Sequence, residues 1–304
     1  MDLNGDGHLD VLSGSYSHMA QPMAGLFQVL WGSEDGFQVA EALTGIDDEP
    51  LIIESTNFVD SISTRPFAAD IDADGDLDLV VGTFAGSFYL FKGENGSFQQ
   101  KATKIKAGTR TLNAGAHSDP FLVDWDSDGD LDLLSGNSYG RVAISINSGT
   151  AQEADFGKFQ TLIKGPKVSR ETVFGDKHIN RPMASSRIWV EDFNGDGKLD
   201  ILVGDSLTIT HPADGLEEDE ALEKMQEWDA ELAELMKKYQ PLMMQSAKSA
   251  TQSNMQESEE ESHSKLSQED QMQEYQETIN KHYEARQEIL REDRTGYVWV
   301  YYQK

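Results

Sequence analysis

A nine-residue acidic segment recurs four times along the 304-residue chain, and it restricts the possible folds more than any other feature. The copies read DLNGDGHLD, DIDADGDLD, DWDSDGDLD and DFNGDGKLD, and they begin at Asp2, Asp70, Asp124 and Asp192. Each is followed by an apolar run that ends in a glycine, at Gly14, Gly82, Gly136 and Gly204. Recurring short strands with Gly-rich turns are typical of β-propellers, in which each repeat forms one small sheet. The sequence therefore predicts an all-β propeller with one blade for each of the four loops.

Further strand patterns lie on both sides of the loops. Runs rich in β-branched and aromatic residues follow them at residues 25–31, 86–91 and 140–146. Short apolar runs precede the second and third loops at residues 66–69 and 120–123. Met1 stands directly before the first loop, so the strand that should lead into that loop is missing. We therefore expect a chain that is truncated at its N-terminus and is a fragment of a larger propeller.

The fourth repeat is interrupted after Gly204, and its next expected strand comes only at residues 296–302. In between, apolar residues recur every three or four positions over 217–239 and again over 272–290. That spacing predicts two amphipathic helices. We expect an antiparallel helical hairpin, a short coiled coil, inserted into the last blade. The predicted domains are the blades with their loops (1–210), the insertion (211–295) and the returning strand (296–304).

Local signals predict where the two helices begin and end. Asp214 and Ser267, each followed three residues later by an acidic residue, resemble N-terminal caps. Pro241 predicts the end of the first helix, because proline lacks a backbone donor and clashes with the preceding turn. The Ser-, Gln- and Glu-rich stretch 245–264 is predicted to be a mobile tip. The hairpin is either a partner-binding arm or a solvated hairpin whose apolar stripes cover each other, and we favour the second interpretation.

Charge and composition exclude several classes of function. Acidic residues outnumber basic ones by 54 to 25, which gives a formal net charge of -29. Because a phosphate backbone needs a basic face, we expect no nucleic-acid partner, whereas a cation would suit this balance. Cysteine is absent, which excludes disulfides, thiol catalysis and cysteine-based zinc sites. No apolar run is long enough for a membrane span.

The repeated loop has the ligand chemistry of a calcium site. It offers side-chain oxygens at positions 1, 3, 5 and 9 and a glycine at position 6 for a sharp turn. Position 7 varies in residue type, so we expect it to contribute its backbone carbonyl. Calcium prefers about six to eight oxygen ligands, whereas zinc and copper prefer His or Cys. We predict one Ca²⁺ per loop, four in all, bound by Asp2, Asn4, Asp6, His8, Asp10, Asp70, Asp72, Asp74, Asp76, Asp78, Asp124, Asp126, Asp128, Asp130, Asp132, Asp192, Asn194, Asp196, Lys198 and Asp200.

Two other interpretations of the loops fit less well. An EF-hand needs a glutamate at position 12 and a helix after it, but position 12 is Ser or Val here and a strand pattern follows. A plain β-turn without metal would leave many carboxylates close together and mutually repulsive in each of four loops. We therefore retain the calcium interpretation.

The loops and their trailing apolar-glycine runs resemble the FG-GAP/VCBS repeats of integrin-α-like β-propellers. The resemblance covers about residues 1–210 and 296–304, and the Asp/Asn positions match in all four copies. It implies a propeller with calcium in a loop of each blade. It also implies a secreted, cell-surface or periplasmic location and a role in binding or adhesion. The helical insertion departs from the family pattern, so nothing is implied for it.

We expect a non-catalytic scaffold that binds a protein or glycan ligand. The alternative is a carbohydrate-active propeller, polysaccharide lyase-like or lectin-like, in which a base and an arginine would act on an acidic sugar. Candidates are His117, His178, Arg181 and His211, but none lies in a recognisable catalytic motif. Charged residues also precede proline upstream of three loops, in Arg65-Pro66, Asp119-Pro120 and Arg181-Pro182. We favour a purely structural role for these pairs; the alternative is that they line one propeller face and contact a ligand.

Overall fold

The computed structural model describes residues 1–15, 26–55, 57–167, 172–251 and 259–304. The chain divides into two compact units. The first comprises Met1–Val168, Ile179–Leu207 and Thr295–Lys304, and the second comprises Ser169–His178 and Thr208–Arg294. That residues 211–295 form an autonomous insertion stays a prediction.

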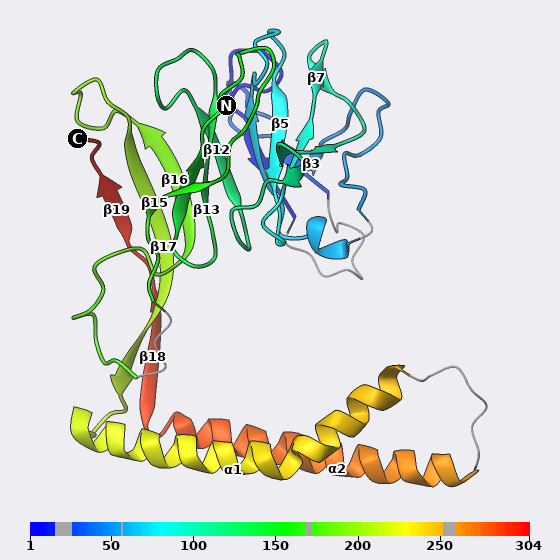
Figure 1. Cartoon of the computed structure of the whole chain (residues 1–304), viewed down its shortest axis with the longest axis vertical. Helices are drawn as coiled ribbons and strands as arrows, with labels where there is room; N and C mark the ends of the chain where they lie inside the picture. The colour runs from blue at the N-terminus through cyan, green and yellow to red at the C-terminus, as the bar shows by residue number, and fades with distance from the viewer. Residues whose placement is uncertain (16–25, 56, 168–171, 252–258) are drawn as a thin grey trace. The chain divides into compact units, whose positions relative to one another are not determined.

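The first unit is built from antiparallel sheets that follow one another along the chain (Figure 1). The first sheet contains β1 (Val11–Ser13), β2 (Gln28–Leu30) and β3 (Glu41–Ala42). The second contains β4 (Arg65–Ala69), β5 (Asp78–Gly82), β6 (Phe88–Phe91) and β9 (Thr103–Lys104). The third contains β12 (Asp119–Val123), β13 (Asp132–Gly136), β14 (Val142–Ser145) and β15 (Gln160–Ile163). The fourth contains β16 (Ala184–Glu191), β17 (Asp200–Pro212) and β19 (Val298–Tyr301); β18 (Leu290–Thr295) also pairs with β17, and the end of β17 and most of β18 belong to the second unit.

Small elements connect these strands. They are the 3-10 helix η1 (Phe58–Asp60) and the two-residue strands β7 (Gly93–Glu94), β8 (Ser97–Phe98), β10 (Lys106–Ala107) and β11 (Arg110–Thr111). The strands predicted after the second and third loops are confirmed as β6 and β14, and β19 lies within the stretch 296–304, whose role as a returning strand of the last blade stays a prediction. The prediction of an all-β chain is confirmed only in its coarser form, as mostly antiparallel sheet plus two long helices.

Consecutive sheets pack face to face, and side chains that alternate along a strand serve different cores. On β5, Leu79 and Val81 pack with Phe27 and Val29 of the first sheet. Val80, between them, packs with Leu133 of the third sheet. On β13, Leu134 lies instead in the core that the third sheet shares with the fourth. Because strand side chains point alternately to opposite faces, each inner sheet is apolar on both faces.

Three of the four glycines that end the apolar runs, Gly14, Gly82 and Gly136, lie at close approaches between neighbouring sheets, whereas Gly204 does not. A Cβ added at Gly82 would lie 2.2 Å from the carbonyl oxygen of Ser118, and one at Gly136 would lie 2.3 Å from that of Ser186. Backbone hydrogen bonds join the same places, from Ser118 N to Thr83 O at 3.2 Å and from Ser186 N to Asn137 O at 2.9 Å. At Gly82 and Gly136 the recurring glycine is therefore a sheet-to-sheet contact.

The second unit contains α1 (Glu218–Thr251) and α2 (Glu259–Arg286), which run alongside each other (Figure 1). Four details of the prediction are wrong. Pro241 lies inside α1, α2 begins before Ser267, and Leu290 belongs to β18. The proposed cap at Asp214 also lies outside α1, which begins at Glu218. Residues 252–258 of the predicted mobile tip lie outside the described residues, and the remainder of that stretch is helical.

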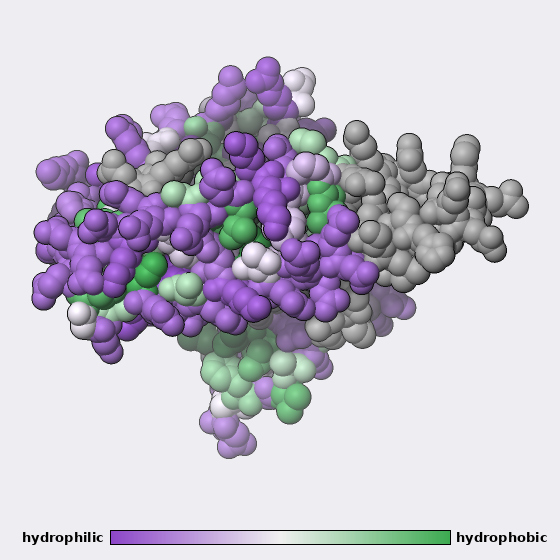
Figure 2. Space-filling view, turned by 90° about the horizontal axis from the view of Figure 1, so that it is seen from below, coloured by the Kyte–Doolittle hydropathy of each residue, from purple (hydrophilic) through white to green (hydrophobic). Residues whose placement is uncertain are grey.

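An aromatic cluster holds α1 to α2. Trp228 stacks on His282 with ring centroids 4.5 Å apart, and its Nε1 donates to His282 O at 2.7 Å. Tyr239 of α1 packs on Tyr275 of α2 with centroids 5.0 Å apart. Hydrophilic residues cover most of the described surface that faces the viewer in Figure 2. In the part of the chain that the structure describes, no helix is long and apolar enough to cross a membrane.

Candidate metal centres

Each repeated loop makes the same tight turn. The position-6 glycines Gly7, Gly75, Gly129 and Gly197 all have positive φ, between 81° and 96°. L-residues with a Cβ rarely adopt this conformation, which explains why the sequence has glycine there in every copy. The backbone at position 4 also has positive φ in every loop, at Gly5, Ala73, Ser127 and Gly195.

The position-1 aspartate closes the turn by accepting backbone hydrogen bonds. In the first loop, Asp2 accepts from the backbone nitrogens of Gly5, Asp6 and Gly7 at 2.8, 3.2 and 2.8 Å. Asp192 repeats the arrangement in the fourth loop, with the same three positions at 2.7, 3.1 and 2.8 Å. Asp70 and Asp124 accept from the backbone at positions 5 and 6. The loop is therefore preorganised by its first carboxylate.

The position-9 aspartate links the loop to a more distant strand. Asp78 accepts from Ile71 N at 3.0 Å and from Gly93 N at 2.6 Å. Asp132 does the same with Trp125 and Asn147. All four position-9 residues are buried, and each accepts backbone bonds on both oxygens: Asp10, Asp78, Asp132 and Asp200. Sequence reasoning did not find this structural role, and their predicted role as metal ligands stays a prediction.

The second and third loops each bring together three carboxylates that could hold an ion. One oxygen each from Asp70, Asp72 and Asp78 lies within 4.8 Å of the others, and Asp124, Asp126 and Asp128 form a similar group. In the first and fourth loops, Asn4 and Asn194 take position 3, and their Nδ2 atoms donate to the position-5 aspartates at 3.0 and 3.2 Å. The first and fourth loops therefore have fewer carboxylates than the second and third.

In the second loop a lysine ammonium contacts the acidic group. Lys92 Nζ lies 2.6 Å from Asp72 Oδ2 and 3.6 Å from Asp74 Oδ2. The hydrogen bond to Asp72 and the charges of Asp72 and Asp74 raise the pKa of Lys92 above its ordinary value. The acidic group of the second loop therefore stabilises a positive charge, which the ammonium of Lys92 supplies.

Carboxylate oxygens without a partner show that the loops suit a further cation. Asp72 Oδ1 and Asp130 Oδ1 are both buried and accept no hydrogen bond. An unsatisfied buried carboxylate oxygen is costly, and a bound Ca²⁺ would satisfy it with the oxygen chemistry that this ion prefers. The residues of the second and third loops therefore fit the implied calcium.

The pKa directions of the loop aspartates differ with their surroundings. Burial, followed by the charges of Asp128, Asp126 and Asp124, raises the pKa of Asp130 above its ordinary value. Burial likewise raises the pKa of Asp78 and of Asp132. By contrast, the backbone hydrogen bond from His8 is the main cause that lowers the pKa of Asp6.

Position 7 is placed differently from loop to loop. Asp76 accepts from Asn95 N and Gly96 N at 2.8 and 2.9 Å, so its side chain ties the loop to the β7–β8 turn. Asp130 is buried, whereas Lys198 is exposed. The expectation that position 7 acts through its backbone carbonyl stays a prediction.

The histidines and arginine considered as catalytic candidates lie in both units. His117 and Arg181 belong to the first unit, and His178 and His211 to the second. Arg181 is exposed and donates to Asn180 Oδ1 at 2.9 Å. His211 Nε2 lies 3.4 Å from Asp293 Oδ2. The structure thus gives these residues separate surroundings.

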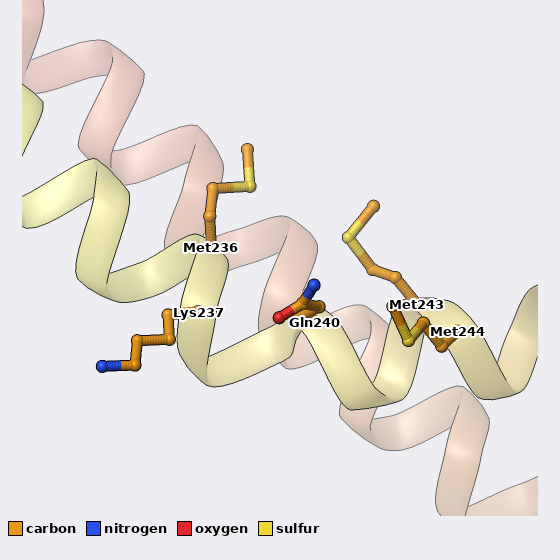
Figure 3. Close-up of a pocket in the computed structure, with 5 residues that line it drawn as sticks. All are labelled: Met236, Lys237, Gln240, Met243 and Met244. Atoms are coloured by element: carbon orange, nitrogen blue, oxygen red, sulfur yellow. The ribbon is translucent and has the colours of Figure 1, made fainter.

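A shallow apolar hollow lies on α1. Its volume is about 490 Å³, and Met236, Lys237, Gln240, Met243 and Met244 line it (Figure 3). Nothing among the described residues indicates what would cover it.

Comparisons with known proteins agree with the loop geometry. A family model described as FG-GAP-like repeat matches residues 2–81, 70–135 and 124–203. No curated protein matches the chain. A solved structure of the Photorhabdus luminescens Tc holotoxin pore is similar over 60% of this chain, with a TM-score of 0.36 and 14% sequence identity. The match spans 7% of that chain's length.

Proposed function

The chain belongs to the FG-GAP-like repeat family, and from this membership we propose that it is a calcium-binding β-propeller scaffold that binds a protein or glycan ligand without catalysis. We further propose that it works outside the cell, at the cell surface or in the periplasm. The observation that carries the calcium proposal is the pair of buried, unpartnered carboxylate oxygens of Asp72 and Asp130.

The packing of the sheets supports the propeller. The second and third sheets each use both faces, one against the preceding sheet and the other against the next. The first strands β4, β12 and β16 lie next to one another, with β12 between the other two. Radial sheets whose first strands adjoin are the arrangement of propeller blades.

Calcium would act here as a structural ion. It would neutralise the loop carboxylates and hold the turn between the first two strands of the second, third and fourth sheets. Asp70, Asp72 and Asp78 would contribute in the second loop, and Asp124, Asp126 and Asp128 in the third. Binding to the folded state alone stabilises it in proportion to the logarithm of the free calcium concentration.

Terbium luminescence tests the calcium proposal, because Trp125 lies inside the third loop and can transfer energy to a bound lanthanide. We expect Tb³⁺ emission excited through tryptophan, displaced by Ca²⁺ and reduced by Trp125→Phe. Asp128→Ala should remove the third-loop site, whereas Asp155→Ala, a similarly exposed aspartate outside the loops, should not. If Asp128→Ala and wild type bind the same number of ions by calorimetry, the third-loop site is wrongly assigned.

One observation favours the alternative, a carbohydrate-active propeller. His117, Arg65 and Arg187 line a single hollow of the first unit. Burial, with the charges of Arg65 and Arg187, lowers the pKa of His117, which favours the neutral imidazole that a base requires. Formation of an unsaturated product from an acidic polysaccharide would support this alternative, and binding without turnover would support the scaffold.

A further inference from the structure

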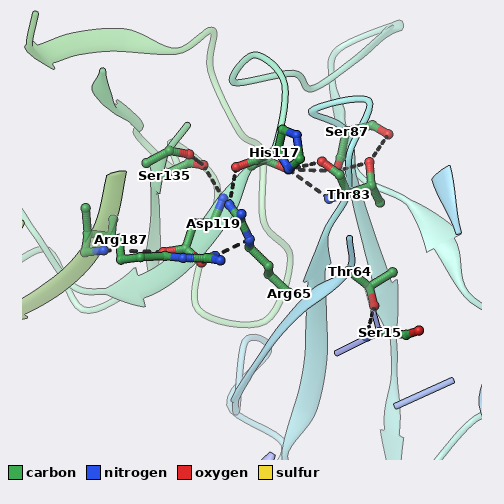
Figure 4. A network of polar contacts seen from close by, with 12 residues as sticks. Ser15, Thr64, Arg65, Thr83, Ser87, His117, Asp119, Ser135 and Arg187 are labelled. Carbon is green, nitrogen blue, oxygen red and sulfur yellow. Dashed lines mark hydrogen bonds and ion pairs between the residues drawn. The ribbon is translucent and has the colours of Figure 1, made fainter. Parts of the chain in front are cut away.

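A polar hollow lies where the first strands of three sheets adjoin. Its volume is about 580 Å³, and its lining includes Ser13, Thr64, Arg65, His117, Ser185 and Arg187. Figure 4 shows Arg65 and Arg187 directed toward Asp119 from opposite sides. The volume is in the usual range for small-ligand sites, about 300–1,000 Å³.

The two arginines that line this hollow, and Asp119 with which both pair, occupy one repeated register position. Arg65 is paired with Gly82, Asp119 with Gly136, and Arg187 with Gly204. Each stands five residues before the first aspartate of its loop. The pair Arg181-Pro182, which the sequence suggested as the fourth-repeat equivalent, is therefore not equivalent; Arg187 is.

Both arginines pair with the same carboxylate. Asp119 Oδ1 lies 2.8 Å from Arg187 Nη1 and 4.0 Å from Arg65 Nε, so one carboxylate serves two guanidinium groups. The side chain of Arg187 is 53% exposed, against 12% for Arg65. Arg187 can therefore turn its remaining donors to a ligand, while Arg65, which also donates to His117 O, holds Asp119 and the adjoining backbone in place.

Backbone strain is concentrated at the same place. Ser63, His117 and Ser185 all have left-handed backbones, with φ of 48°, 57° and 52°. Each stands two residues before Arg65, Asp119 or Arg187, and all three line the hollow. Such conformations cost about 1–3 kcal/mol each and cluster at ligand-binding sites, where the surrounding structure maintains them.

Resting on the binding role proposed above, we propose that this hollow binds a hexuronate residue of an acidic glycan, with Arg187 pairing to its carboxylate. Arginine matches a carboxylate in a planar, bidentate geometry. Serine and threonine hydroxyls from β1, β4 and β16 and their flanking residues surround the arginine pair. Hydroxyls suit the ring hydroxyls of a sugar better than they suit an apolar ligand.

Calorimetric or NMR titration of the whole chain with glucuronate and galacturonate, with glucose and galactose as neutral controls, tests this inference. We expect the uronates to bind and the neutral sugars to bind at least about tenfold more weakly, because loss of a charge-assisted hydrogen bond has about that effect. Arg187→Gln should weaken uronate binding by about 10- to 100-fold for the same reason. Arg110→Gln, an exposed arginine of β11 outside the hollow, should leave it unchanged.

Ser13→Tyr gives a second test that does not alter charge, since Ser13 is exposed on β1 and a tyrosine there would narrow the hollow. We expect it to weaken uronate binding. Equal affinity for neutral and acidic sugars, an unchanged Arg187→Gln variant, or tighter binding of a Glu-Asp dipeptide than of either uronate would overturn the inference. Calcium binding is measured on the same samples. If the chain binds calcium but no uronate, only the proposed uronate site is refuted. If it binds uronate but no calcium, only the calcium proposal is refuted.

Discussion

Replacing the recurring glycine with alanine should destabilise the protein at two repeats and spare it at a third. An added Cβ at Gly82 would lie 2.2 Å from Ser118 O and 2.8 Å from Ser118 Oγ, and one at Gly136 would lie 2.3 Å from Ser186 O. At Gly204 the nearest atom would be Arg187 Cβ at 4.0 Å, which is ordinary contact. The three positions are equivalent in the repeat, so Gly204→Ala is a matched control.

The expected magnitude follows from these distances. A carbon and a carbonyl oxygen approach to about 3.3 Å at closest, so Gly82→Ala must separate the second and third sheets locally by about 1 Å. This separation should weaken two hydrogen bonds between the sheets. In the wild-type structure Thr83 N donates to Ser118 Oγ at 2.9 Å and Ser118 N donates to Thr83 O at 3.2 Å. Overpacking and these lost bonds should together cost about 2–4 kcal/mol. Gly204→Ala should instead gain a few tenths of a kcal/mol, about what the loss of unfolded-state freedom gives.

Thermal unfolding followed by far-UV circular dichroism measures both effects in the same buffer. We expect the midpoint to fall by about 4–16 °C for Gly82→Ala and Gly136→Ala, because each kcal/mol shifts a unit of this size by about 2–4 °C. Gly204→Ala should stay within about 2 °C of wild type. Equal destabilisation at all three positions would refute the explanation that sheet-to-sheet contact selects glycine.

Three further predictions concern the second loop, a buried carboxylate and the insertion. Lys92→Met should tighten calcium binding at the second loop, because the ammonium that contacts Asp72 and Asp74 competes with the ion; unchanged calorimetric affinity would contradict this. Burial alone would raise the pKa of Asp60, but hydrogen bonds from Tyr89, Lys104, Ser87 and Ser55 outweigh it and lower the pKa. The ionised Asp60 carboxylate therefore stabilises the fold fully above the unfolded-state pKa of about 3.9, and this stabilisation is lost as pH falls through the folded-state pKa. Asp60→Asn should lower the free energy of unfolding by about 2 kcal/mol at pH 7 and by much less near pH 2, as measured by denaturant unfolding. Replacing residues 208–294 by a short Gly-Ser turn should remove most helical circular dichroism and leave calcium binding intact, and a variant that fails to fold would show that the second unit is integral.

The repeat was readable from the sequence because its signals are local. Loop residues, the glycine at position 6 and the flanking strand patterns all lie within about one blade, and they correctly located β5, β6, β13 and β14. The end of the first helix was misplaced because proline was treated as a terminator. In the structure α1 continues through Pro241 to buried Leu242, and Figure 1 shows α1 bent along its length. Proline inside a helix commonly bends it, and tertiary burial can offset the lost hydrogen bond.

The candidate site was only partly readable because some partners are remote in sequence. Asp78 accepts from Gly93 N, 15 residues on, but Asp200 accepts from Gln303 N, 103 residues on. No local pattern reveals such backbone donors. Arg187 could have been found, since it stands five residues before Asp192 just as Arg65 stands before Asp70. The proline beside Arg181 drew attention to the wrong residue.

Equilibrium dialysis against Ca²⁺ tests the central claim, that the four acidic loops are calcium sites, most directly. We predict about one ion bound per loop, with thermal stability that rises with free calcium and falls in excess EGTA. No bound calcium at millimolar concentration, together with a thermal midpoint that EGTA leaves unchanged, would contradict it.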